Sequence, residues 1–245
     1  MNVVGVVCAL AAEARQLGPT TRRQPALRLL ADGTLVAISG MGDAAASRGA
    51  RTLIDAGAGA LVSFGVAGGL DPALAAGTLC LPSEVAGLDG SAIATTRRWR
   101  EQLAAALAAH GPVACGRLLT SARAIGSVAD KAALFRSTGA AAVDMESLSV
   151  AQAAAACRLP FIAVRAIVDA AADVLPRAVT AAADSAGRLQ LWRLLGALAL
   201  APADLWPLLR LARCFRAASR SLGAVARSGA LTPLSYALSP DTRAT

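Results

Sequence analysis

Short apolar runs alternate along the chain with longer segments in which apolar residues recur at helical spacing. The runs, rich in Val, Ile and Leu, predict buried strands at residues 3–8, 35–38, 60–64, 77–81, 117–120, 142–144 and 161–164, with further strand near residue 85. Helical spacing predicts helices at 11–17, 44–56, 100–110 and 129–138. This alternation predicts a three-layer α/β/α domain, with a mixed central sheet flanked by helices.

Acidic residues follow three of the predicted strands. Glu13 and Asp169 each come about five residues after a strand, and Glu146 comes just after the strand at 142–144. Open α/β sheets bind ligands at the carboxyl ends of their strands, so the three carboxylates are expected to converge above one edge of the sheet. Each acid alone is better explained as a helix cap or a solvated charge, so the interpretation depends on this convergence.

Two glycine-rich segments also follow predicted strands directly: Ser-Gly-Met-Gly at residues 39–42 and Gly-Val-Ala-Gly-Gly at residues 65–69. Glycine lets backbone N–H groups approach a ligand closely, so both segments are expected to be turns that line a binding site. Neither segment contains GxGxxG, and no phosphate-binding loop of the GxxxxGK[ST] type is present.

Composition and charge divide the chain in two. Its 245 residues are 56% hydrophobic, enough for one globular domain with a sizeable core. Residues 186–245 carry eight Arg and two Asp, a net charge of +6, against +2 for residues 1–185. We therefore expect an α/β domain at 1–185 and a basic helical extension at 186–245. Because the positive charge lies in the tail, an anionic surface is a better partner for it than nucleic acid.

Residues 204–227 predict a helix with one basic and one apolar face. The arginines are Arg210, Arg213, Arg216, Arg220 and Arg227, and the apolar residues opposite them are Leu208, Leu211, Phe215, Leu222 and Val225. Leu209 breaks the pattern, and Trp192 and Trp206 lie before and at the start of the helix. Such a helix suits the interface of an anionic membrane. Packing on its own domain or on a second subunit is an equal alternative.

The remaining composition bears on location and metals. Five widely spaced cysteines and a single histidine form no metal-ligand set, and they favour reduced thiols in the cytoplasm. The apolar N-terminus lacks a basic segment before it, so it is expected to be a strand and not a signal peptide. No apolar run reaches the roughly 18–20 residues that a bilayer span needs.

Five ordered motifs resemble the nucleoside phosphorylase superfamily, on the side of the methylthioadenosine/S-adenosylhomocysteine nucleosidases. They are residues 5–13 ending in Glu13, the two glycine segments, Val-Asp-Met-Glu-Ser at 143–147 and Arg-Ala-Ile-Val-Asp at 165–169. The resemblance covers about residues 3–185. It implies a nucleoside phosphorylase-like fold, cleavage of the N-glycosidic bond of a purine nucleoside, no metal or organic cofactor, and assembly into a homodimer or larger homo-oligomer.

The resemblance also implies a role for each matching residue. Glu146 would accept hydrogen bonds from the ribose 2′- and 3′-hydroxyls, with Met145 packed under the sugar. Asp169 would protonate or hydrogen-bond purine N7, and Glu13 would activate an attacking water. Independently of the resemblance, we expect apolar surroundings to raise the pKa of Asp169. Acid and base on opposite sides of the breaking bond suit an oxocarbenium-like transition state. The rest of the nucleoside pocket would involve Gly40, Val66, Gly68 and the backbone of Ile125.

Several positions depart from the family's pattern. Val168 and Val66 stand where the family often has Ser, and Ala124 stands where an aromatic side chain would stack on adenine. Asp169 is therefore expected to act with less local help than the family's pattern gives, and base stacking is expected to be weaker. Ser63 stands where phosphorylases usually have Arg, which favours water over phosphate as the nucleophile. Arg123, beside the expected base pocket, keeps phosphate open, although a solvated loop charge explains this residue slightly better.

The basic, Leu- and Trp-rich tail on a short Ala- and Arg-rich domain resembles the hopanoid-associated phosphorylase subfamily. This resemblance implies that the substrate is adenosylhopane, a membrane lipid of hopanoid biosynthesis, and that the enzyme sits peripherally on the inner membrane face. One alternative is a soluble methylthioadenosine/S-adenosylhomocysteine nucleosidase or purine nucleoside phosphorylase that uses its tail for dimer packing. Another is a non-catalytic nucleoside-binding protein, against which the presence of all three acids speaks.

Overall fold

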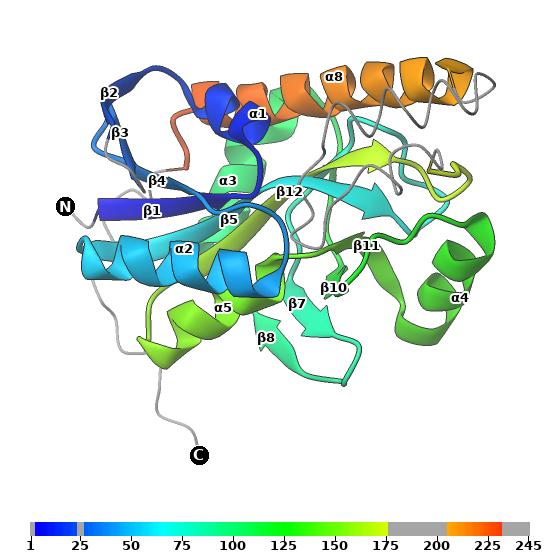
Figure 1. Cartoon of the computed structure of the whole chain (residues 1–245), viewed down its shortest axis with the longest axis horizontal. Helices are drawn as coiled ribbons and strands as arrows, with labels where there is room; N and C mark the ends of the chain where they lie inside the picture. The colour runs from blue at the N-terminus through cyan, green and yellow to red at the C-terminus, as the bar shows by residue number, and fades with distance from the viewer. Residues whose placement is uncertain (1–2, 24–26, 176–204, 232–245) are drawn as a thin grey trace.

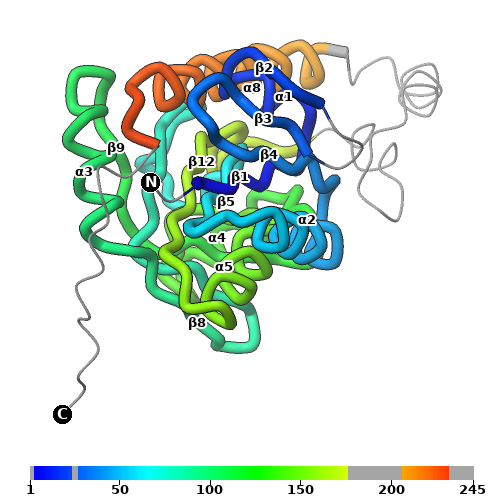
Figure 2. The backbone as a smooth tube through the Cα atoms, turned by 90° about the vertical axis from the view of Figure 1, so that its left-hand side faces the viewer, coloured from blue at the N-terminus to red at the C-terminus, as the bar shows by residue number. Residues whose placement is uncertain are grey.

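The computed structural model describes residues 3–23, 27–175 and 205–231. Within these ranges, twelve strands form one mixed sheet with helices on both faces (Figure 1). Helices α2, Asp43–Asp55, and α5, Ser147–Ala156, cover one face. Helices α1, Ala11–Ala14, α3, Arg97–Leu107, and α8, Leu205–Arg227, lie on the other (Figure 2). The predicted fold class, a mixed sheet flanked by helices, is confirmed.

The sheet is ordered β2-β3-β4-β1-β5-β11-β10-β7-β8, and β12 also pairs with β5 and β6, and β6 with β9. The strands are β1 Val3–Cys8, β2 Thr20–Arg23, β3 Arg28–Leu30, β4 Leu35–Ile38, β5 Ala58–Gly69, β6 Leu79–Cys80, β7 Glu84–Gly87, β8 Ala92–Ala94, β9 Val113–Ala114, β10 Arg117–Thr120, β11 Ala140–Asp144 and β12 Phe161–Asp169. Helix α4 spans Val128–Thr138, and 3-10 turns span Arg15–Leu17 and Ala108–His110.

The predicted strands at residues 3–8, 35–38 and 117–120 match β1, β4 and β10 from end to end. Four short strands, β2, β3, β8 and β9, were not predicted. In β2 and β8 no residue is buried. Without a buried face, a strand needs no alternation of apolar and polar residues, so its sequence gives no periodic signal.

The longest strand, β5, corrects the prediction of a glycine turn at residues 65–69. The strand does not end at residue 64 but continues to Gly69, and none of its glycines after residue 64 has a positive φ. A Cβ atom at Gly65 would lie 2.5 Å from both Arg165 Nη1 and Glu13 Oε1. Glycine is therefore required at residue 65 because the backbone lies against these side chains, and not because the chain turns there.

The glycine segment of β5, residues 65–69, is where the site-bearing strands meet. Strands β1 and β12 run parallel to β5, and Asp169 at the end of β12 pairs with Gly68. Strand β11 pairs antiparallel to β5 at the same place, with Val143 opposite Gly68. Residues that follow β1 and β11, and the last residue of β12, consequently gather around this segment.

Helix α8 confirms the predicted helix and shows that residues of its second half pack in the core. Ala218, Leu222 and Val225 are buried in the same core cluster as Trp99 of α3. The five arginines predicted for the basic face are all exposed. Near the start of the helix, Trp206 and Leu209 remain 75% and 46% exposed. Among residues 3–23, 27–175 and 205–231, no helix has the length and apolar character needed to cross a bilayer. The boundary at 185/186 and Trp192 lie outside the described residues.

Candidate active site

Glu13 lies in the short helix after β1 and is almost fully buried. Its Oε2 accepts a hydrogen bond from the Leu10 N–H at 2.8 Å, and its Oε1 accepts one from the Val66 N–H at 3.0 Å. Burial raises the pKa of Glu13, while Arg165 and the backbone N–H donors act in the opposite direction. The donors fix the carboxylate beside β5 and leave lone pairs free to accept a proton from water.

Glu146 connects the glycine segment at residues 39–42 with its own motif at residues 143–147. Its Oε1 accepts a hydrogen bond from the Gly42 N–H at 3.0 Å, and its Oε2 accepts one from the Met145 N–H at 3.2 Å. Gly42 has a φ of +89°, a left-handed conformation that glycine adopts readily. Burial, together with the charge of Asp144, raises the pKa of Glu146 to about 7. This carboxyl therefore changes charge close to neutral pH.

A buried ion pair that was not predicted from the sequence lies close to these acids. Arg165 Nη2 is 2.7 Å from Asp144 Oδ2, and the same guanidinium donates to the hydroxyls of Ser63 and Ser147 at 2.7 and 3.0 Å. Thr120 donates to the other oxygen of Asp144 at 2.8 Å. An arginine inside a strand of buried apolar residues requires a buried carboxylate partner. That requirement was the available sequence signal for the pair.

Asp169 is held by a side chain that the sequence analysis also missed. Lys131, on α4, donates a hydrogen bond to Asp169 Oδ2, and the two side chains are 0% and 7% exposed. Val168 offers Asp169 no polar side chain, as its sequence shows, but Lys131 reaches the acid from a distant part of the chain. Burial raises the pKa of Asp169, as expected, and Lys131 opposes the shift. A lone lysine in a helix with apolar neighbours was the signal.

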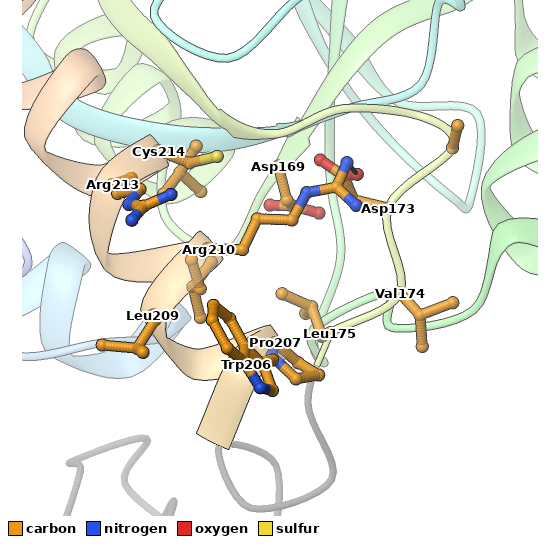
Figure 3. A pocket seen from close by; sticks show the side chains of 13 residues that line it. Asp169, Asp173, Val174, Leu175, Trp206, Pro207, Leu209, Arg210, Arg213 and Cys214 are labelled. Carbon is orange, nitrogen blue, oxygen red and sulfur yellow. Dashed lines mark hydrogen bonds and ion pairs between the residues drawn. The ribbon is translucent and has the colours of Figure 1, made fainter. Parts of the chain in front are cut away.

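A cavity of about 570 Å³ opens beside Asp169, between residues 168–175 and the first turns of α8 (Figure 3). Arg210 of α8 lies across it and forms an ion pair with Asp173. Most of the lining is apolar: Val168, Ala172, Val174, Leu175, Trp206, Pro207, Leu209 and Leu211. A mostly apolar cavity with a few polar groups is typical of a site for an organic ligand.

The remaining predicted residues lie nearby but are less directly connected. Gly40 adopts a φ of +87° in the same loop as Gly42, and its carbonyl accepts a hydrogen bond from the Ser39 hydroxyl at 2.7 Å. Ile125 packs against the small core cluster that contains Val143. Arg123 is exposed, and no hydrogen bond or ion pair among the described residues joins it to the three carboxylates. Its role in anion binding stays a prediction.

The fold and the three buried carboxylates agree with a family match. A sequence profile of the phosphorylase superfamily matches residues 4–195. The chain therefore belongs to the phosphorylase superfamily, as its five motifs predicted. A search of curated protein sequences gave no match.

Several solved structures share the fold of this chain. The chain is similar to the 5′-methylthioadenosine/S-adenosylhomocysteine nucleosidase of Helicobacter pylori, solved with butyl-thio-DADMe-Immucillin-A, at 17% identity and a TM-score of 0.70, over 93% of this chain and 96% of that one. It is similar to the futalosine hydrolase of the same organism at 16% identity and a TM-score of 0.71, over 94% and 97% of the chains. It is also similar to the 5′-methylthioadenosine/S-adenosylhomocysteine nucleosidase of Neisseria meningitidis, at 18% identity and a TM-score of 0.67, over 93% of this chain and 100% of that one. At these identities the likeness shows the fold.

Proposed function

We propose that this protein cleaves the N-glycosidic bond of an adenine nucleoside and releases adenine. The observation that carries the proposal is that three buried carboxylates follow or end strands that pair with β5, two of these strands pairing at its glycine segment. Glu13 is bonded to Val66, Asp169 lies beside Gly68, and Glu146 follows β11, which pairs with the same segment. Three carboxylates in separate buried positions can divide the roles of sugar binding, acid and base.

The reaction assigns one role to each acid. Glu146 accepts hydrogen bonds from the ribose hydroxyls, and Asp169 donates a proton to purine N7 as the N9–C1′ bond breaks. The electron pair of that bond goes to the base, and the sugar passes through an oxocarbenium-like state. Glu13 takes a proton from the water that attacks C1′. The raised pKa of Asp169 supports its role as an acid.

Water is the favoured nucleophile because Arg165, the buried cation near Glu13, already forms its hydrogen bonds within the protein. The guanidinium of Arg165 is bound by Asp144, Ser63 and Ser147, and the residue is 2% exposed. It is not available to hold a phosphate ion in the site.

The cavity at Asp169 supports a substrate that carries a large apolar group, with adenosylhopane of hopanoid biosynthesis as the specific candidate. The cavity continues to Trp206 and Leu209, which are exposed on α8. Exposed arginines follow on the same helix, and each adds about 1 kcal/mol of attraction to an anionic leaflet. We therefore propose a peripheral location on the inner membrane face. Cleavage of methylthioadenosine or S-adenosylhomocysteine is the second candidate, supported by the fold of the H. pylori nucleosidase.

Adenine release tests the activity and the substrate together. The protein is incubated with adenosylhopane in vesicles, with methylthioadenosine and with S-adenosylhomocysteine, each with and without phosphate. We expect the fastest release from adenosylhopane, with no effect of phosphate. Faster release from methylthioadenosine would support the second candidate. Binding without any release of adenine would identify a non-catalytic nucleoside-binding protein.

Vesicle flotation tests the membrane part of the proposal. The full chain should float with anionic vesicles and not with neutral ones. The double variant Arg216→Glu/Arg220→Glu should float less while cleaving a soluble adenine nucleoside at the normal rate. If the unchanged protein does not float, the lipid-linked substrate loses its main support. Light scattering tests the homodimer or larger homo-oligomer that we also propose.

A further inference from the structure

We propose that Lys131 is a positioning residue for the acid Asp169: its ammonium holds Oδ2 and leaves Oδ1 to meet purine N7. The inference rests on the proposed function, because it assigns Asp169 the proton that N7 receives. It adds a residue from α4, a helix that contributes no other residue to the reaction as proposed.

The surroundings of the Lys131 ammonium account for each of its three donors. It donates to Asp169 Oδ2, to the Ala170 carbonyl at 2.8 Å and to the Asp173 carbonyl at 3.0 Å. The side chain is fully buried. A compact ammonium can direct three donors to acceptors spread around one point, whereas the planar fork of arginine cannot. Lys131 is the only lysine among the 24 Lys and Arg residues of the chain, so a lysine occurs where this geometry is needed.

Both partners of the ion pair are fixed by their own elements. Helix α4 is capped at its start by Ser127, whose hydroxyl accepts from the Asp130 N–H at 3.0 Å, and it ends at Gly139 in the left-handed conformation. Across the pair, Asp173 accepts from the Ala170 N–H at 3.0 Å and from Arg210. Lys131 therefore joins a rigid helix to the short loop that follows the acid.

The position of Lys131 has two consequences for the acid step. When Asp169 passes its proton to N7, the new carboxylate already lies against a cation, which stabilises the charge that forms. The lysine itself transfers no proton. The same cation opposes the burial that raises the pKa of Asp169. Removing it should make Asp169 hold its proton to higher pH and leave the carboxyl free to rotate.

The test compares Lys131→Met with Arg136→Met, which removes an exposed cation from the same helix. We expect Lys131→Met to lower kcat for an adenine nucleoside by about 10- to 100-fold and to move the alkaline limb of the pH profile of kcat/KM to higher pH. Arg136→Met should behave like the unchanged protein. If Lys131→Met changes neither kcat nor the pH limb, the proposal is wrong.

A second substrate separates positioning from a purely structural role. The leaving group of 4-nitrophenyl β-D-ribofuranoside needs no proton, so Lys131→Met should cleave it within about 3-fold of the normal rate. Equal losses on both substrates would mean that the lysine only supports the fold, and would overturn the proposal. An unchanged protein that cleaves neither substrate would instead refute the proposed function.

The ion pair is also observable without turnover. Labelling with ¹⁵N-lysine gives a single ammonium resonance, because the chain has one lysine. We expect this resonance to shift in Asp169→Asn and to remain unchanged in Asp55→Asn, an exposed control. If the chemical shift of the Lys131 ammonium does not change in Asp169→Asn, the proposal is wrong, and this result does not require Lys131→Met to fold.

Discussion

The proposed site has two ends, one with Glu13 and Glu146 and the other with Asp169. The carboxylates at these ends are held by different chemistry. Glu13 and Glu146 accept hydrogen bonds from backbone N–H groups, which belong to Leu10, Val66, Gly42 and Met145. Asp169 is held by a side-chain ammonium, that of Lys131. Backbone donors are set by the path of the chain and need glycine for close approach, whereas an ammonium is set by one residue. The first end should therefore be sensitive to changes in the backbone and the second to a change of one side chain.

The largest expected effect comes from neutralising an acid at each end. Asp169→Asn and Glu13→Gln should each lower kcat by about 10²- to 10⁴-fold, because an amide can neither give nor take the proton. Adenine release, measured with confirmed folding, checks this. The loss in Asp169→Asn should be much smaller on 4-nitrophenyl β-D-ribofuranoside, and the loss in Glu13→Gln should persist there. Near-normal turnover of Asp169→Asn on an adenine nucleoside would remove Asp169 from the acid role.

Two glycines of β5 that lie against the acids, Gly65 and Gly68, should differ in how well they tolerate a methyl group. At Gly65 a Cβ would lie 2.5 Å from Arg165 Nη1 and from Glu13 Oε1, so Gly65→Ala should destabilise the fold by about 2–4 kcal/mol. At Gly68 the nearest atoms are the Asp169 carboxylate oxygens at 3.4 Å, so Gly68→Ala should cost less than about 1 kcal/mol. Urea unfolding measures both. Equal stabilities would contradict the crowding at residue 65.

The contrast also explains what the sequence could and could not predict. Glu13, Glu146 and Asp169 follow strands with clear apolar patterns, so their gathering at one edge was predictable. Lys131 and Asp169 are 38 residues apart in the sequence, and no local pattern joins them. The glycine segment was misread because glycine in a turn and glycine under a crowded side chain look alike in sequence. The structure distinguishes the two, because the side chains of Arg165 and Glu13 lie against Gly65 and its φ is not positive.

The pH dependence of stability should single out Glu146. Its pKa is raised from an ordinary 4.5 to about 7, so the folded state binds a proton more tightly than the unfolded state between these values. The stability this gives is fully present below about pH 4.5 and is lost as the pH rises to about 7, by about 2–3 kcal/mol.

Glu146→Gln should therefore flatten part of the fall in unfolding free energy between pH 4.5 and 7, as measured by urea unfolding. In the unchanged protein, KM should also rise below pH 7, because a protonated carboxyl is a weaker acceptor for the ribose hydroxyls. Asp55→Asn, an exposed change on α2, is the matched control. A stability slope that survives Glu146→Gln would assign the titration to another group.

The smallest effect is expected at Arg210, the contact of α8 with the loop after Asp169. Its side chain is 71% exposed, so its ion pair with Asp173 should contribute less than about 1 kcal/mol. If Lys131 alone fixes Asp169, Arg210→Ala should leave kcat for a small adenine nucleoside within about 2-fold of normal, with Arg227→Ala, far along the same helix, as control. A fall in kcat as large as that of Lys131→Met would show that Asp169 depends on α8 as well. The acid end would then be tied to the same helix that carries the exposed Trp206 and Leu209, and a vesicle bound there would be expected to alter kcat.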